Sequence, residues 1–282
     1  MAASSCAARS LAAGEPLAGT ASQAAVLLLL EVRRGWGRDV LDGSPLGGAL
    51  LDRLRVWTEE RRGAKVLFIR RPDRGAGELR AFVVDVAGSP PSVRSLELAR
   101  HDDLLDLDLD YDGRPLPEPI AVVCGHARRD RCCARLGLPL FDALQGDFDA
   151  QALWISSHQG GHRFAPNLLW LPDGLAFGRV APADARSLVA ELRARRLPTG
   201  NLRGRIALPA EAQAAEIAAR EAFGIEGLTD VHVIAAGRDA VRLSTPRGEI
   251  EVRVESQPGP VVPASCGVEP AATAVYAATV VR

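Results

Sequence analysis

Two pairs of potential metal ligands constrain this chain more than any other feature of its sequence. Cys124 and Cys133 bracket one short segment, and His158 and His162 bracket a second one that begins 25 residues after Cys133. Iron and zinc both accept thiolate and imidazole ligands. A site built from two such pairs needs each pair on a loop that can converge with the other. The chain therefore has to bring two loops together.

The residues around the cysteines predict a strand, a loop and a helix in that order. Residues 120–123 are a short β-branched run that leads directly into Cys124, and residues 133–144 have the apolar spacing of a helix. Residues 153–155 form a further short strand that leads toward His158. Both ligand pairs are thus expected on loops that follow buried strands.

The two glycines between the histidines indicate a loop rather than a helix. A helix would also place His158 and His162 on one face, but Gly160 and Gly161 inside it would cost about 2 kcal/mol relative to alanines. A single buried Cys or His is usually structural. The paired spacing of four such residues is what favours a metal site.

Cys132 and Cys133 lie near the expected start of a helix and beside Arg128, Arg129 and Arg131. Positive charge and free backbone N–H groups lower the pKa of a thiol, so we expect thiolates here, as ligands or as nucleophiles. For the three arginines, a solvated loop is as good an interpretation as a role beside the metal site. The four tryptophans are expected in the core rather than in a site.

The remaining pattern predicts an α/β protein in three parts: an N-terminal α/β region over residues 1–117, a middle domain over 118–197 and a small α+β unit over 198–282. The segment 101–119, in which Asp alternates with Leu before prolines follow, is expected to be a loop or linker, with an acidic edge strand as the alternative. Helical spacing occurs at 46–61, 133–144, 182–197 and 209–223. Strand-like runs occur at 25–32, 65–71, 79–86, 93–98, 120–123, 153–155, 168–171, 175–180, 231–235, 240–244 and 249–254.

Composition excludes several classes of protein. Lys and Arg number 34 against 35 Asp and Glu, which leaves no basic excess for nucleic acid. The longest apolar run, residues 24–32, is interrupted by Glu31 and is far shorter than the roughly 20 residues that cross a bilayer. The first 14 residues lack the features of a secretory signal, so we expect a cytoplasmic protein. Five cysteines, three of them within ten residues, suit metal binding better than a disulfide framework, and Cys6 and Cys266 receive no role.

Two segments resemble the sucrase/ferredoxin-like family. They are Cys-Gly-His-x-x-Arg-Asp-x-Cys-Cys at 124–133 and His-x-Gly-Gly-His-x-Phe-Ala-x-Asn at 158–167, supported by Phe-Gly-Arg-Val at 177–180. The segments Ala-Gly-Glu-Pro-Leu-Ala-Gly-Thr at 13–20 and Trp-Gly-Arg-Asp at 36–39 are similar to its bacterial branch. The resemblance extends over roughly residues 6–190 and, more weakly, over the tail around Cys266 and Gly267.

The resemblance implies a thioredoxin-like ferredoxin domain at 118–197 with a [2Fe-2S] cluster, as in members that bind it through two Cys and two His. On this sequence the ligands would be Cys124, Cys133, His158 and His162. Fungal members carry another residue at the position of Cys132, so Cys132 stays open as an alternative to Cys133. His126 forms only half of a Rieske-type Cys-x-His motif and is expected beside the ligands, not among them.

The expected function is single-electron transfer to or from an unidentified redox partner protein or reductase. The protein is expected to be a carrier rather than a catalyst, and the family name implies no glycosidase activity. Imidazole ligands raise the potential of a cluster and can couple the electron to a proton. Two alternatives remain: a structural zinc site, and a thiol redox protein that uses Cys132 and Cys133.

Overall fold

A computed structural model describes residues 5–33, 35–42, 44–71, 77–149 and 151–281. Over these residues the strands form a mixed sheet of ten and an antiparallel sheet of four, which confirms the mixed α/β class. The chain divides into two compact units. The first, called the sheet unit, comprises Ala24–Gln159 and Leu168–Gly174, and the second, called the hairpin unit, comprises Met1–Gln23, Gly160–Asn167 and Leu175–Arg282.

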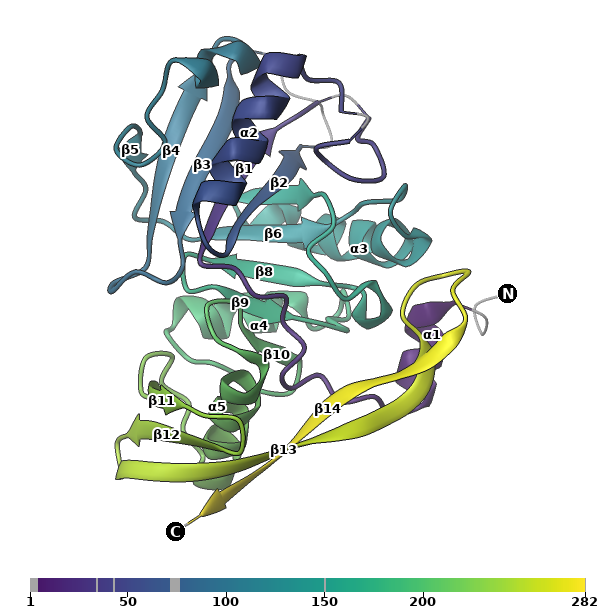
Figure 1. The fold of residues 1–282 in the computed structure, drawn as a ribbon, viewed down its shortest axis with the longest axis vertical. Helices are drawn as coiled ribbons and strands as arrows, with labels where there is room; N and C mark the ends of the chain where they lie inside the picture. The colour runs from purple at the N-terminus through teal and green to yellow at the C-terminus, as the bar shows by residue number, and fades with distance from the viewer. Residues whose placement is uncertain (1–4, 34, 43, 72–76, 150, 282) are drawn as a thin grey trace. The chain divides into compact units, whose positions relative to one another are not determined.

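The sheet unit contains eight strands in the order β8-β6-β7-β2-β1-β3-β4-β5 (Figure 1). The pairs β1–β2 and β6–β7 are parallel, and every other neighbouring pair in this order is antiparallel. The strands are β1 (Val26–Glu31), β2 (Ala64–Arg70), β3 (Leu79–Asp85), β4 (Ser92–Leu98), β5 (Arg114–Pro115), β6 (Ile120–Cys124), β7 (Leu153–Ser156) and β8 (Leu168–Leu171).

Helices cover the strands of this unit because their apolar residues recur at helical spacing. Helix α2 (Gly48–Glu60) buries Leu50, Leu54 and Trp57 and packs against β2 (Figure 1). Helix α3 (Arg131–Leu144) packs against β6 and β7. All four tryptophans are buried, as predicted. The candidate ligands Cys124 and His158 lie at or just after the ends of β6 and β7.

The pairing of β2 with β7 joins the two halves of the sheet unit. Ile69 lies opposite Ser156, and Arg70 opposite Ile155. The segments predicted as the N-terminal region and the middle domain therefore share one sheet in this unit. The division at residues 117 and 197 stays a prediction.

The hairpin unit is built around α5 (Ala210–Phe223), which packs on the sheet β11-β12-β13-β14. The small side chains of Ala212, Ala215 and Ala219 let the helix approach Val241 and Val252 closely. Its elements are α1 (Cys6–Ala12), η4 (His162–Phe164), β9 (Leu175–Phe177), α4 (Ala185–Arg193), β10 (Leu202–Arg205), α5, β11 (His232–Ala236), β12 (Ala240–Thr245), β13 (Gly248–Pro263) and β14 (Pro270–Val281).

Several elements differ from the sequence predictions. The prediction of a strand only to residue 254 was wrong, because β13 continues to Pro263 and pairs with β14, with a register irregularity beside Pro258 where a missing N–H is tolerated. The opening segment contains α1. The predicted linker 101–119 contains a 3-10 helix, η2 (His101–Leu105), and the edge strand β5.

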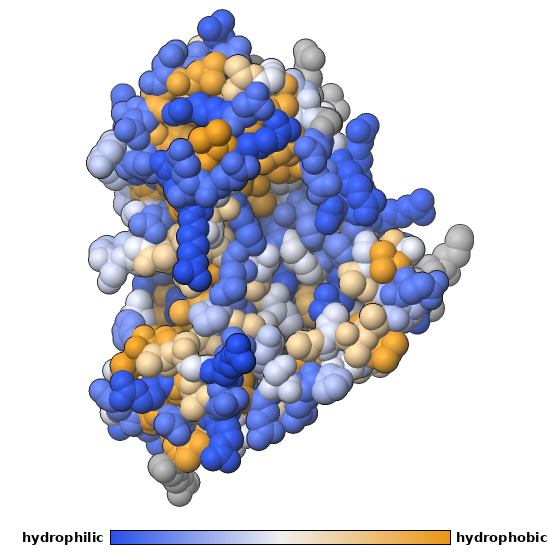
Figure 2. Space-filling model, viewed as in Figure 1, coloured by the Kyte–Doolittle hydropathy of each residue, from blue (hydrophilic) through white to orange (hydrophobic). Residues whose placement is uncertain are grey.

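In Figure 2, hydrophobic colour recurs along the β13–β14 hairpin, where Val261 and Val268 are exposed.

Candidate metal centre

Three residues of the sheet unit bring two thiols and one imidazole together. Cys124 is the last residue of β6, Cys133 lies in the first turn of α3, and His158 follows β7 by two residues. One potential ligand atom from each lies within 4.8 Å of the other two. The Cys133 Sγ is 3.8 Å from His158 Nδ1. Both cysteines are buried and His158 is half-buried.

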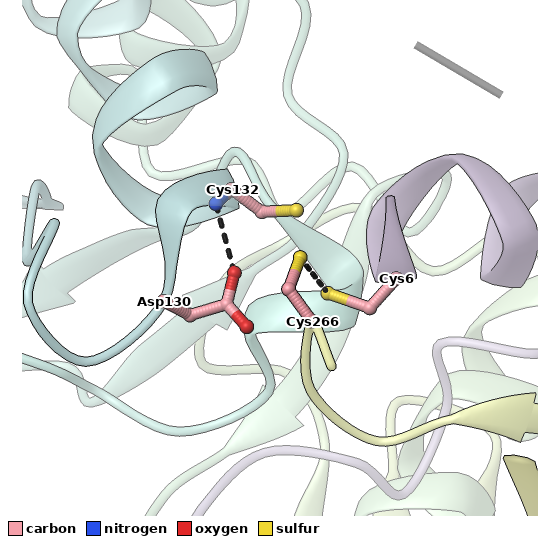
Figure 3. A group of neighbouring side chains, drawn as sticks. All are labelled: Cys6, Asp130, Cys132 and Cys266. Atoms are coloured by element: carbon pink, nitrogen blue, oxygen red, sulfur yellow. Dashed lines mark hydrogen bonds between the residues drawn. The ribbon is translucent and has the colours of Figure 1, made fainter. Parts of the chain in front are cut away.

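Two local features place the cysteines opposite each other. The Asp130 carboxylate accepts a hydrogen bond of 2.8 Å from the Cys132 N–H and caps the start of α3 (Figure 3). Gly137 then allows the helix to pass close to β6, since a Cβ atom there would stand 2.1 Å from the Cys124 carbonyl oxygen. The capped start and this close approach together fix the distance between Cys124 and Cys133.

The backbone that carries His158 is held on both sides. The Ser157 N–H donates to the Phe68 carbonyl at 2.7 Å, and the Phe68 N–H donates to Ser157 Oγ at 2.9 Å. On the other side, the His158 N–H donates to Nδ1 of His126 at 3.2 Å. His158 is therefore positioned by β2 and by the loop that follows Cys124.

His126 links this loop to residues 36–39. Its Nε2 lies 2.8 Å from the Gly37 carbonyl, and its ring packs edge-on against Trp36 with centroids 5.6 Å apart. Burial lowers the pKa of His126 below its ordinary value. The neutral ring with hydrogen on Nε2 satisfies both contacts, because Nδ1 then accepts from His158. The structure thus places His126 beside a predicted ligand, as expected.

The two thiols of the centre are electrostatically unequal. The Cys133 S–H donates to the Cys124 sulfur, and contacts from His158 and the Gln159 backbone N–H add to it, so the pKa of Cys124 lies well below its ordinary value although burial opposes this. The same hydrogen bond and burial raise the pKa of Cys133. The pair therefore favours one thiolate, at Cys124, and one thiol.

This result corrects the predicted electrostatics of the cysteine loop. We expected neighbouring arginines to lower the pKa of Cys133, but it is raised, because Cys133 donates to Cys124 and is itself buried. Arg129 forms an ion pair of 2.6 Å with Asp39, and Arg128 and Arg131 are exposed. The arginines belong to the solvated face of the loop.

Cys132 and His162 are the remaining candidate ligands. Cys132 is buried but does not belong to the group formed by Cys124, Cys133 and His158 in the described part of the chain. His162 begins η4 in the hairpin unit. The loop before it contains Gly160 at φ +93° and Gly161 at φ +71°, which confirms the predicted turn and explains the glycines.

Arg203 anchors the His162 loop within the hairpin unit. Its guanidinium is buried and donates to the Gly160 carbonyl at 3.0 Å and to Asn167 Oδ1 at 2.9 Å. The Asn167 side chain in turn donates to the Gly161 carbonyl at 3.1 Å. A side chain added at Gly161 would stand 2.3 Å from the guanidinium. The glycine is needed because the arginine occupies that space.

Three residues that contribute to the centre were not predicted from the sequence. Asp130 before a helical run is an N-cap signal, and Gly137 inside an apolar helical pattern indicates a close backbone approach, so both could have been found. Gln159 contributes through its backbone N–H. No sequence pattern reveals such a contribution.

This mixed α/β protein thus has two buried thiols beside a half-buried imidazole. It belongs to a class that can hold a soft or borderline metal, because iron and zinc prefer those donors. The sequence profile of the sucrase/ferredoxin-like family matches residues 17–204, about two thirds of the chain. The chain belongs to this family.

Curated relatives include fungal proteins named "Altered inheritance of mitochondria protein 32". The protein from Eremothecium gossypii is 34% identical over 110 residues, which cover 34% of this chain and 35% of the relative. That from Debaryomyces hansenii is 27% identical over 92 residues, 29% of this chain and 34% of the relative. The chain thus spans about a third of the length of these relatives.

Among solved structures, a thioredoxin-like [2Fe-2S] ferredoxin from Aquifex aeolicus matches with 20% identity and a TM-score of 0.26, covering 30% of this chain and 97% of that chain. None of the helices in the described part of the chain combines the length and apolarity that a membrane span requires.

Proposed function

We propose that this protein is a single-electron carrier that holds a [2Fe-2S] cluster through Cys124, Cys133, His158 and His162. The observation that carries the proposal is the group formed by the buried Cys124 and Cys133 and the half-buried His158, whose potential ligand atoms lie within 4.8 Å of one another. Membership of the sucrase/ferredoxin-like family supports it. His162 enters from its place in the His-x-Gly-Gly-His motif.

The donor set fits such a cluster. A [2Fe-2S] cluster takes four protein ligands, and thiolate with imidazole is an accepted combination that supplies one-electron redox chemistry when bound. The lowered pKa of Cys124 favours the thiolate that a metal requires. The Gln159 N–H contacts the same sulfur and adds a hydrogen bond that stabilises negative charge there.

The contacts of Cys133 favour a metal site over thiol redox chemistry at Cys132 and Cys133. Cys133 contacts Cys124 and His158. Consecutive residues of a helix point about 100° apart, which separates Cys132 from the same group.

We further propose a thioredoxin-like domain over residues 118–197, a cytoplasmic location, and a redox partner protein or reductase as the electron source or sink.

Iron and acid-labile sulfide analysis of the anaerobically purified full chain tests the proposal. We expect about two iron and two sulfide per chain, visible absorption, and an electron paramagnetic resonance signal after reduction. Cys133→Ser should lose the cluster while the matched control Cys132→Ser keeps it. His162→Ala should lose or alter the cluster. A colourless protein with one zinc and no sulfide would overturn the proposal in favour of a structural zinc site.

A further inference from the structure

Two cysteines without a role in the proposed centre meet within the hairpin unit. Cys6 and Cys266 are 260 positions apart in sequence, yet their Sγ atoms are 3.5 Å from each other (Figure 3). Cys6 is the first residue of α1 and fully buried, whereas Cys266 is partly exposed. The Cys266 residue is thus partly open to solvent, whereas Cys6 is not.

Each cysteine is held by its own local structure. Helix α1 starts at Cys6 because the Ser5 hydroxyl accepts a hydrogen bond of 3.2 Å from the Ala8 N–H. Cys266 occupies the turn between β13 and β14, which the Val268 N–H closes onto the Ser265 carbonyl at 3.2 Å. Helix α1 packs against β13 and against η4. The thiols therefore meet through packed elements of the unit.

We propose that Cys6 and Cys266 form a reversible redox pair that closes to a disulfide by exchange with a low-molecular-weight disulfide such as glutathione disulfide. A disulfide bond is about 2.05 Å long, so the sulfurs need to approach by about 1.5 Å from their present contact. Rotation of the Cys266 side chain in the turn between β13 and β14 can bring the sulfurs together by this amount. The pair shares no residue with the proposed metal centre.

The exposures of the two thiols set the order of the exchange. The Cys266 thiolate attacks one sulfur of glutathione disulfide, which forms a mixed disulfide and releases one glutathione thiolate. The Cys6 thiolate then attacks the Cys266 sulfur and releases the second glutathione. The two protons lost by the cysteines are taken up by the two glutathione thiolates. Two cysteine thiols and one glutathione disulfide thus give one protein disulfide and two glutathiones.

Closure would tie the start of α1 to the turn of the β13–β14 hairpin. Disulfides inside reducing compartments are usually transient and regulatory, and a partly exposed bond is one that thiols can reduce again. Because α1 also packs on η4, oxidation would restrict the segment that begins with His162. The pair is a candidate redox-sensitive clamp on that segment.

Peptide mapping of the full chain tests the pair. The protein is equilibrated with graded ratios of glutathione disulfide to glutathione, quenched in acid, alkylated and digested without reduction. We expect a peptide that links Cys6 to Cys266 to rise from a minor to the major species as the ratio increases, and to disappear after dithiothreitol. Alkylation of both cysteines at every ratio would overturn the proposal.

Single substitutions test the order of attack. Cys6→Ser should leave Cys266 as a stable mixed disulfide with glutathione, whereas Cys266→Ser should leave Cys6 unmodified in the folded protein because it is buried. The control Cys132→Ser should keep the Cys6–Cys266 link. A stoichiometric metal in the purified protein that Cys6→Ser removes would show that the thiols are ligands and would overturn the disulfide.

Discussion

Replacing Gly137 by alanine should open the candidate metal centre. The added Cβ would stand 2.1 Å from the Cys124 carbonyl oxygen, whereas ordinary contacts of this kind are 3.4–4 Å. Helix α3 would have to move away from β6 by about 1 Å, and Cys133 would move with it. Such overpacking costs about 1 to 3 kcal/mol. Alanine is more favourable than glycine in a helix by at most about 1 kcal/mol, which does not offset the overpacking, so we expect the variant to be less stable.

The matched control for this variant is Gly48→Ala in α2. No atom lies within 4 Å of a Cβ built at Gly48, so this substitution should be neutral or stabilising by up to about 1 kcal/mol. Urea denaturation measures both stabilities, and iron and sulfide analysis measures the centre. We expect Gly137→Ala to lower the denaturation midpoint and the iron content, with Gly48→Ala lowering neither. Full iron content and wild-type stability in Gly137→Ala would refute the argument that this close approach fixes the cysteines.

Three further predictions concern charge. His158→Cys should keep a cluster and lower its reduction potential, because a thiolate adds negative charge at the iron. Voltammetry measures the potential, and an unchanged value would contradict ligation by His158. Burial lowers the pKa of Lys65 below its ordinary value of 10.5, so the folded state disfavours the ammonium, and Lys65→Met should raise the urea midpoint at pH 7. That gain should shrink as the pH approaches 10.5, where the unfolded lysine also loses its proton, and a gain independent of pH would contradict this origin. Glu216→Gln should cost about 3 to 5 kcal/mol in urea denaturation, because it removes the buried negative charge that pairs with Arg220 at 2.9 Å and with Arg205 at 3.1 Å, while exposed Glu221→Gln should change stability by at most about 0.5 kcal/mol.

Much of the centre could be predicted from the sequence because its signals are local. The β-branched run before Cys124, the helical spacing after Cys133 and the glycine pair between the histidines each determine their own backbone within a few residues. The residue types and the strand–loop–helix order followed from them. The glycine loop was confirmed because both glycines have positive φ, which other residues rarely adopt.

The fold beyond these local elements depended on long-range pairing. Strand β14 was missed because its partner β13 contains Pro258, and such a sequence reads as a loop until the pairing of the two strands is known. The pairing of β2 with β7 joins segments about 85 residues apart through two register positions, which periodicity cannot reveal.

The sequence by itself determined which chemistry is available: thiol and imidazole donors in pairs, on loops after buried strands. Only the tertiary structure decided which of two adjacent cysteines meets Cys124. Cys132 and Cys133 are the same residue type at adjacent positions. A helix turns 100° per residue, so their side chains point in different directions. Its rotation is set by the Asp130 cap and by the contact of Gly137 with the Cys124 carbonyl. That contact joins residues 13 positions apart, so it exists only once α3 has packed on β6.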